Sequence, residues 1–304
     1  GHRIFPFPIF IFRVTAMRNI KLTLAYDGTD FCGWQVQPGK PTIQGALNDV
    51  LRRITQEEIT VHGAGRTDAG VHAEGQVAHF RTESALAATE FQRALNALLP
   101  PAVRVRTAQE VDGRFHARHQ AVAKTYVYRI YRGEVAPPFL WRYVLHYPYP
   151  LDEEAMRVAA PLFEGEHDFT SFAALSGAVE DESGRSRKFS PVKTILQSEL
   201  RIVRSGESAD GAGGVCASQN SLSGGELVYL VRGRSFLRYM VRKMAGTLLE
   251  IGRGRMAPQD ITKLFELRDG SRSGPTVAPQ GLCMHSVEYG EPSTAYRRQL
   301  TVDS

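Results

Sequence analysis

The chain has 304 residues and a formal net charge of +5, with a sequence pI of about 9.2. Apolar residues make up 42% and charged residues 23%, a composition typical of a folded globular protein rather than a disordered or fibrous one. The sequence has no run of about 18 apolar residues, so we expect no transmembrane helix.

Three cysteines, Cys32, Cys216 and Cys283, lie far apart and form no CxxC pair. This pattern fits neither a disulfide framework nor a zinc site, and it is typical of a reducing compartment. We therefore expect a cytoplasmic protein. The positive charge suits an anionic partner such as nucleic acid, although many proteins without such a partner share it.

Residues 1–16 contain the apolar stretch IFPFPIFIF, which weakly resembles a secretory signal. Its two prolines and its short length argue against that interpretation. Met17, followed by RNIKLTLAYDG, resembles a natural start. We expect residues 1–16 to be an extension that is non-native or disordered.

Residues 17–117 alternate between predicted strands and helices and are expected to form one subdomain. Ile20, Leu22 and Leu24 alternate with polar residues, as in a half-buried strand. Thr42 is placed to cap a helix whose apolar residues lie three and four positions apart. The other predicted elements are a strand over 58–62, the strand QVAHF, a helix opened by a capping box at Thr89-x-x-Gln92, and a strand over 103–111.

Residues 118–290 predict a second subdomain, followed by a tail over 291–304. Asp152 is the predicted cap of a helix, and the Gly- and Ser-rich residues 205–225 predict a mobile insertion between two paired strands. The remaining predicted elements are a strand over 124–131, a helix over SFLRYMVRKMAGTLLEIGRG, a helix over 258–267 and the strand LCMHSVEY. Both subdomains are expected to be antiparallel sheets with helices on one side, an α+β fold.

The stretch GAGRTDAGVHA holds one carboxylate, Asp68, between small residues. It could be a tight turn in which Asp68 bonds to its own backbone. It could also belong to a metal-dependent hydrolase using His62, His72 and His79, although their spacing matches no zinc or magnesium pattern. Alternatively, Asp68 could perform a reaction, with the glycines letting a substrate approach. The residues alone leave these interpretations open.

Several motifs in this sequence resemble the TruA family of tRNA pseudouridine synthases. AGRTDAGVHA resembles the active-site motif of that family, and AYDGTDFCGWQ resembles its opening strand and aromatic loop. FHAR followed by AKTYVYRIY resembles its second motif. HDFTSF, FLRYMVRKMAG with LLEIGRGR, and GPTVAPQGL follow in the order of the family. The resemblance spans roughly residues 17–289.

The resemblance implies an α+β pseudouridine synthase fold with two ferredoxin- or RRM-like halves. Their antiparallel sheets join into a central sheet, with the helices on one side. It also implies an isomerase that converts uridine to pseudouridine in the anticodon stem-loop of tRNA, without cofactor or metal. The family works as a homodimer, so the expected partners are tRNA and a second copy of the chain.

The same resemblance assigns the site residues. Asp68 matches the catalytic carboxylate, Arg242 the arginine that pairs with it, and Tyr126 the active-site tyrosine. Because burial alone raises the pKa of a carboxyl group, we expect a cation such as this arginine to offset that rise. The role implied for Tyr126 is to stack on the target base and to help remove its C5 proton. Arg66 matches the arginine of the motif and is expected to contact the RNA or hold the target nucleotide out of its stack.

Further basic residues are candidates for RNA contacts, because RNA phosphates attract Arg and Lys. These candidates are Arg93, Arg114, Arg118, Lys124 and Arg255. The alternative function is a non-catalytic tRNA-binding module on the same fold. Binding alone requires none of Asp68, Tyr126 and Arg242, so their joint presence favours the enzyme.

Overall fold

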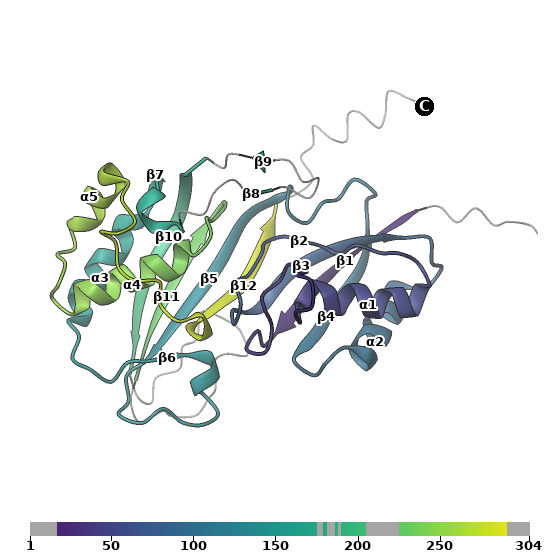
Figure 1. Ribbon diagram of the computed structural model, residues 1–304, viewed down its shortest axis with the longest axis horizontal. Helices are drawn as coiled ribbons and strands as arrows, with labels where there is room; N and C mark the ends of the chain where they lie inside the picture. Colours follow the sequence, from purple (N-terminus) through teal and green to yellow (C-terminus); the bar gives the residue numbers. More distant parts are fainter. Residues whose placement is uncertain (1–16, 175–178, 181–185, 188–189, 205–224, 291–304) are drawn as a thin grey trace, which may run out of the picture.

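The computed structural model describes residues 17–174, 179–180, 186–187, 190–204 and 225–290 (Figure 1). The predicted extension at 1–16, the predicted tail at 291–304 and all of the predicted insertion except Gly225 lie outside these ranges. Within the described ranges, no helix is both long and apolar enough to cross a membrane.

The first half of the chain folds as strand, helix, two strands, helix and strand. Its elements are β1 (Arg18–Tyr26), α1 (Ile43–Thr55), β2 (His62–Gly63), β3 (His72–Thr82), α2 (Ala88–Leu98) and β4 (Val103–Val111). The strands lie in the order β4, β1, β3, β2, and each neighbouring pair is antiparallel. This is the ferredoxin-like arrangement.

The second half repeats this arrangement with additions. Its elements are β5 (Ala121–Tyr131), β6 (Leu145–His146), α3 (Glu153–Ala159), β7 (Gly165–Asp168), β8 (Val179–Glu180), β9 (Ser186–Arg187), β10 (Val192–Val203), β11 (Glu226–Gly233), α4 (Met240–Gly252), α5 (Asp260–Leu267) and β12 (Leu282–Tyr289). The central strands lie in the antiparallel order β12, β5, β11, β10. β7 extends this sheet at β10, β6 pairs with β5, and β8 and β9 form a separate pair. The predicted fold of two such halves in one central sheet is confirmed.

The two halves join along a single edge of β3. One end of this edge pairs with β2, through His62 and Gly63. The other end pairs in parallel with β12, where Cys283 lies opposite His72 and Met284 opposite Ala73. We call this second contact the β3–β12 junction. Because β2 ends after two residues, the loop that follows it, residues 64–71, must cross beside this junction.

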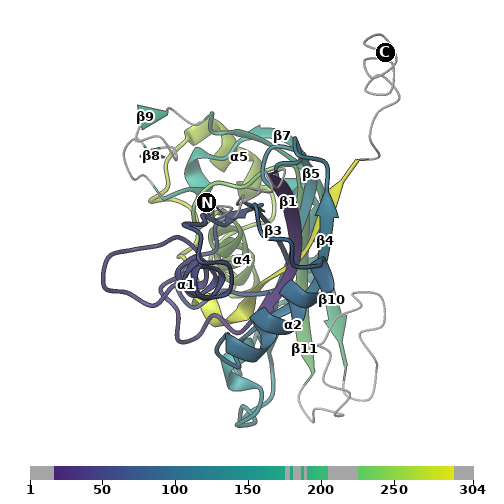
Figure 2. The same ribbon diagram turned by 90° about the vertical axis from the view of Figure 1, so that its right-hand side faces the viewer.

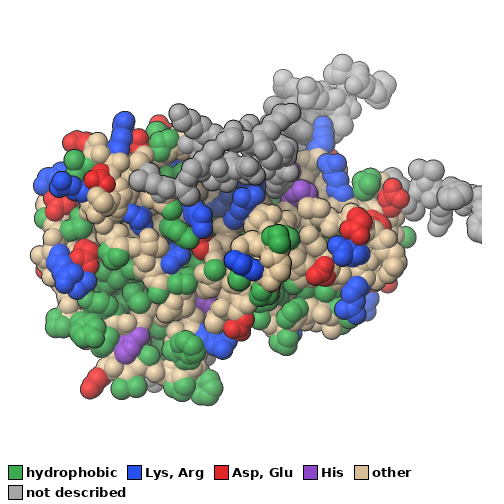
Figure 3. All heavy atoms as spheres, viewed as in Figure 1, with side chains coloured by type: hydrophobic (Ala, Val, Ile, Leu, Met, Phe, Trp, Pro, Cys, Tyr) green, Lys and Arg blue, Asp and Glu red, His purple; other side chains and the backbone are tan. Residues whose placement is uncertain are grey.

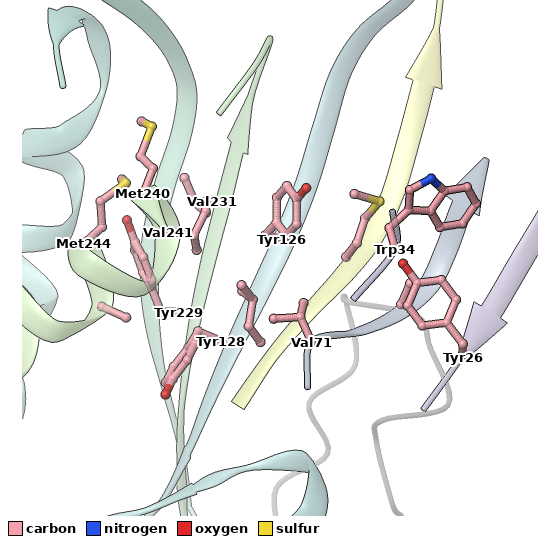
Figure 4. Packing of buried hydrophobic residues seen from close by; sticks show 14 of the residues in the cluster. Tyr26, Trp34, Val71, Tyr126, Tyr128, Tyr229, Val231, Met240, Val241 and Met244 are labelled. Carbon is pink, nitrogen blue, oxygen red and sulfur yellow. The ribbon is translucent and has the colours of Figure 1, made fainter. Parts of the chain in front are cut away.

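The helices labelled in Figure 2, α1, α2, α4 and α5, lie on one side of the sheet. Along β5, Tyr126 and Tyr128 both enter the core beneath the helices, as their alternation in the sequence predicts. Val127 faces the opposite side, where it packs with Val228 and Leu230. In Figure 4, Tyr126 lies at the centre of a row of buried side chains drawn from both halves.

Two predicted helix starts are wrong. α2 begins at Ala88 instead of after Thr89, because the Glu90 carboxylate accepts a hydrogen bond of 2.7 Å from the backbone N–H of Ala87. α4 begins at Met240 instead of near Ser235, because Tyr239 has a left-handed backbone with φ of 63°. The caps predicted at Thr42 and Asp152 are confirmed, since each side chain accepts a hydrogen bond from the first turn of its helix.

The strand predicted over 58–62 is also wrong, because β2 comprises only His62 and Gly63. Side chains of α1 take the preceding backbone groups instead. The Asn48 side chain accepts the Val61 N–H at 3.0 Å, and the Gln44 amide donates to the Val61 carbonyl at 2.8 Å. These bonds fix the segment against α1 before it enters the sheet.

The aromatic loop between β1 and α1 packs directly against the loop at 64–71. The N–H of Trp34 donates to the Thr67 carbonyl at 3.0 Å. Gly33, with φ of +89°, lies so close that an added Cβ would be 2.6 Å from the same carbonyl oxygen. Only glycine fits this position without moving the 64–71 loop.

We predict that Gly33→Ala lowers the free energy of unfolding by about 3 kcal/mol or more, measured by urea denaturation. Gly39→Ala is the matched control, because Gly39 also has a positive φ but nothing lies within 4 Å of its added Cβ. The control should lower the free energy of unfolding by only about 1 kcal/mol, which is the cost of a positive φ for alanine. Equal losses in the two variants would contradict the packing argument.

Candidate active site

The loop at 64–71 is held by its backbone, which leaves the Asp68 carboxylate available. The Ala64 N–H donates to the Val77 carbonyl at 2.7 Å, and the Gln76 amide donates to the Gly65 carbonyl at 2.7 Å. The turn closes with the Val71 N–H donating to the Asp68 backbone carbonyl at 3.1 Å. The self-bonded Asp turn considered from the sequence is therefore replaced by a turn that uses the carbonyl.

The Asp68 carboxylate meets Arg242, which projects from the first turn of α4. Nη1 of Arg242 lies 3.5 Å from Oδ2 of Asp68, while its Nε donates to the Val277 carbonyl at 2.7 Å. The Arg242 guanidinium also lies 5.0 Å from the ring centre of Tyr239. The pair is thus made through one nitrogen, Nη1, rather than through a two-bond fork, and Nε is bonded to the carbonyl of Val277 instead.

Burial and two arginines act in opposite directions on Asp68. Burial raises the pKa of its carboxyl group, and the charges of Arg242 and Arg238 oppose that rise without cancelling it. The Asp68 side chain is 23% exposed and that of Arg242 is 12% exposed. Asp68 is therefore a partly desolvated carboxylate that a ligand can still reach, with a raised pKa and thus a greater nucleophilicity.

Tyr126 lies beside this loop. An added Cβ on Gly65 would be 3.5 Å from its hydroxyl oxygen, so the glycine leaves the approach to that hydroxyl open. Its ring packs edge-on against Phe236 at 5.0 Å. Burial, with nearby Tyr26 and Asp68, raises the pKa of the Tyr126 hydroxyl, which therefore stays protonated at neutral pH. The neutral phenol can donate a hydrogen bond or stack, but it is a weak proton acceptor.

Lys124 lies two residues before Tyr126 on β5, so both side chains are on the same face of the strand. The Lys124 side chain approaches the same loop. Its Cδ would lie 3.8 Å from an added Cβ on Gly65. Burial lowers the pKa of the Lys124 amine to about 8, and the like charge of Arg118 contributes to this. The structure thus places Lys124 close to Gly65 of the 64–71 loop, and Arg118 close enough to Lys124 for their charges to interact.

The other basic candidates are exposed at the surface of the protein. Arg66 is exposed on the 64–71 loop, and Arg93 is exposed on α2. Arg114 pairs with Asp112 at 3.3 Å in the turn before β5. Arg255 is exposed just after α4. In Figure 3, Lys and Arg side chains gather in the middle of the visible face, between the helices of the two halves.

The histidines proposed as metal ligands are divided between two places. His72 accepts the Gly28 N–H at 3.1 Å and bonds to the Arg142 carbonyl at 3.0 Å, both structural contacts. His62 and His79 stack on each other at 5.2 Å. Over the part of the chain that the structure describes, no three His, Cys, Asp or Glu side chains form a metal-binding group.

Two aromatic residues of the site were missed in the sequence. Phe236 supports the ring of Tyr126. Tyr239 lies between two arginines, with Arg238 at 4.7 Å and Arg242 at 5.0 Å from its ring centre. The structure shows a positive φ at Tyr239. No sequence pattern predicts such a backbone angle for a tyrosine, so the sequence held no signal for this residue.

We predict that Arg242→Met raises the pKa of the Asp68 carboxyl further, because burial then acts with less opposing charge. The pH titration of the Asp68 carboxyl carbon by NMR measures this. Arg201→Met is the control, since Arg201 pairs with Glu199 on β10 and should leave that titration unchanged. An unchanged pKa in Arg242→Met would show that the 3.5 Å contact has no electrostatic effect.

Known proteins resemble this chain over most of its length. The sequence profile of a family described as tRNA pseudouridine synthase matches residues 23–120 and 159–290. A protein named tRNA pseudouridine synthase A from Solibacter usitatus (strain Ellin6076) is 46% identical over 273 residues, which cover 90% of this chain and 100% of that protein. A protein of the same name from Geobacillus sp. (strain WCH70) is 41% identical, over 90% of this chain and 98% of that protein.

The family profile matches more than half of the chain, and both relatives align over nearly their whole lengths. The matched residues include the 64–71 loop and α4, which carry Asp68 and Arg242, while β5 with Tyr126 lies between the two matched segments. The resemblance noted in the sequence is confirmed. The chain belongs to the tRNA pseudouridine synthase family.

Proposed function

We propose that this protein converts uridine to pseudouridine in the anticodon stem-loop of tRNA. Family membership supports the reaction, and one structural observation carries the assignment of its site. This observation is the partly buried Asp68 carboxylate held 3.5 Å from Arg242, next to the Tyr126 hydroxyl, where the two halves meet.

The proposed reaction is an isomerisation, so substrate and product contain the same atoms. The N1–C1′ bond breaks, the uracil turns in place, a C5–C1′ bond forms, the C5 proton leaves and N1 gains a proton. The oxygens of Asp68 attack C1′ or the uracil ring, or stabilise positive charge on the ribose. The charge of Arg242 favours the ionised form of Asp68 that each of these roles requires.

The remaining assignments concern the RNA. Tyr126 stacks on the extruded base and donates a hydrogen bond, in keeping with its protonated hydroxyl. Arg66 holds the target nucleotide out of its stack or contacts the backbone. Lys124 is the strongest candidate for a phosphate contact, because the charged neighbour that affects it is another cation, Arg118. Arg114 and Arg118 extend this basic surface along the segment before β5.

A non-catalytic tRNA-binding module would not need the partly buried pair of Asp68 and Arg242. Taking a carboxylate out of water costs free energy even when a cation is near. A binding surface gains more from exposed arginines alone. The pair therefore favours the enzyme over the module.

We predict that Asp68→Asn abolishes pseudouridine formation, because an amide neither attacks carbon nor stabilises a cation as a carboxylate does. Affinity for tRNA should stay within about tenfold of the wild type, or about 1.4 kcal/mol. Pseudouridine is measured in a tRNA transcript by mass spectrometry, and affinity is measured by filter binding. Turnover at the wild-type rate would rule out Asp68 as the reacting group and leave the module as the better account.

We also propose that the protein is a cytoplasmic homodimer that holds one tRNA between its two subunits. The family resemblance supports the dimer, and the proposed tRNA substrate supports the location. We predict the mass of a dimer by light scattering at micromolar concentration, with or without tRNA. A monomeric mass under both conditions would contradict the proposal.

A further inference from the structure

A hollow lies at the opposite end of α4 from Arg242. Its volume is about 440 Å³, within the range of about 300–1,000 Å³ typical of small-molecule sites. It is lined by Tyr147, Tyr149, Pro150, Arg253 and Arg255. Two aromatic rings and two guanidiniums in one hollow are the groups that bind the base and the phosphate of an unpaired nucleotide.

The tyrosines of this hollow are held in place by Arg132. The Arg132 guanidinium donates to the backbone carbonyls of Tyr147 and Tyr149, the latter at 2.8 Å. It also pairs with Glu153 at 3.0 Å, and its side chain is only 14% exposed. The Asp152 N–H donates to the Gly252 carbonyl at 2.7 Å, which ties the tyrosine segment to the end of α4.

The side chain of Tyr149 is exposed to solvent, although its backbone is held by Arg132. It is 66% exposed, although its ring packs edge-on against Tyr147 at 5.3 Å. A large aromatic side chain normally buries more of its surface. A positioned and accessible ring is a stacking surface for a base.

The charge of the hollow is positive. Glu250 pairs with both Arg253, at 2.8 Å, and Arg255, at 3.4 Å. Because one carboxylate neutralises only one of the two guanidiniums, the group of three side chains has a net charge of about +1. The end of α4 carries a partial negative charge from its backbone carbonyls, which opposes an anion. The two arginines must therefore supply the attraction for a phosphate.

The hollow lies within reach of an RNA bound at Asp68. Arg242 and Arg253 are eleven positions apart along α4, which places them about 17 Å apart along the helix. Five stacked nucleotides cover about the same length at roughly 3.4 Å each. The anticodon stem-loop is long enough to place another of its nucleotides here.

We propose that this hollow binds a second nucleotide of the tRNA, with its base stacked on Tyr149 and its phosphate between Arg253 and Arg255. This inference rests on the proposed function and adds a subsite to it. Because the hollow is remote from the reacting atoms, it contributes to affinity and not to the chemical step. Its loss should raise KM and leave kcat unchanged.

The first experiment removes the two charges. The double variant Arg253→Ala/Arg255→Ala should raise KM for a tRNA transcript by about tenfold or more, with kcat within about twofold. The slope of log affinity against log salt should fall by about one. The control is Arg157→Ala/Arg201→Ala, which removes two arginines from another surface hollow, where each pairs with a glutamate. Both doubles lose the same net charge, so a control that changes KM equally would overturn the proposal.

The second experiment tests stacking. In the Asp68→Asn background, Tyr149→Ala should weaken binding of the same transcript by roughly tenfold, and Tyr149→Phe should restore it, because stacking needs only the ring. If both variants bind like the Asp68→Asn parent, the hollow holds no base. Circular dichroism and thermal unfolding verify the fold of each variant.

These outcomes separate the two proposals. If the wild-type protein forms no pseudouridine in tRNA, the proposed function has failed, whatever the hollow binds. If it forms pseudouridine and the Arg253→Ala/Arg255→Ala variant keeps the wild-type KM and salt slope, only the subsite is wrong.

Discussion

The ion pair of Asp68 and Arg242 links two residues that are 174 positions apart in the chain. One comes from a loop of the first half and the other from a helix of the second, so the pair exists only when the halves are joined. Burial raises the pKa of the Asp68 carboxyl group, and the charge of Arg242 opposes that rise. The pKa of this carboxyl group therefore depends on the packing of the two halves.

The neighbouring groups follow from the same packing. β5 lies next to β12 and therefore close to the β3–β12 junction, which places Tyr126 and Lys124 beside the loop at 64–71. Burial has opposite chemical results for these two side chains. It keeps the hydroxyl of Tyr126 protonated, and it makes the amine of Lys124 easier to deprotonate. Near the β3–β12 junction, the site thus combines a carboxylate, a neutral phenol and an amine with a lowered pKa.

The sequence predicted the fold well where local patterns carry the information. The alternation around Tyr126 and the caps at Thr42 and Asp152 are confirmed, because each depends on residues close in sequence. The shortness of β2 was not predictable, because side chains of α1 take the backbone groups of Val61.

The site was predictable only in part. Motif resemblance selected Asp68 and Arg242, and the structure places them together. Arg242 also donates from Nε to the carbonyl of Val277, a contact that no sequence pattern encodes. The same holds for Phe236 and Tyr239, whose roles arise from packing between distant segments.

The place of β12 has a consequence for how the protein is made. It is the last described strand in the chain, yet it lies in the middle of the sheet, between β3 and β5. On the ribosome, the first half can fold as soon as it emerges. Until β12 is synthesised, the parts of β3 and β5 that pair with it stay open, and the two halves lack the strand that unites them. A nascent chain therefore contains the 64–71 loop long before the two halves can join around it. The sheet is complete only after β12 has been translated.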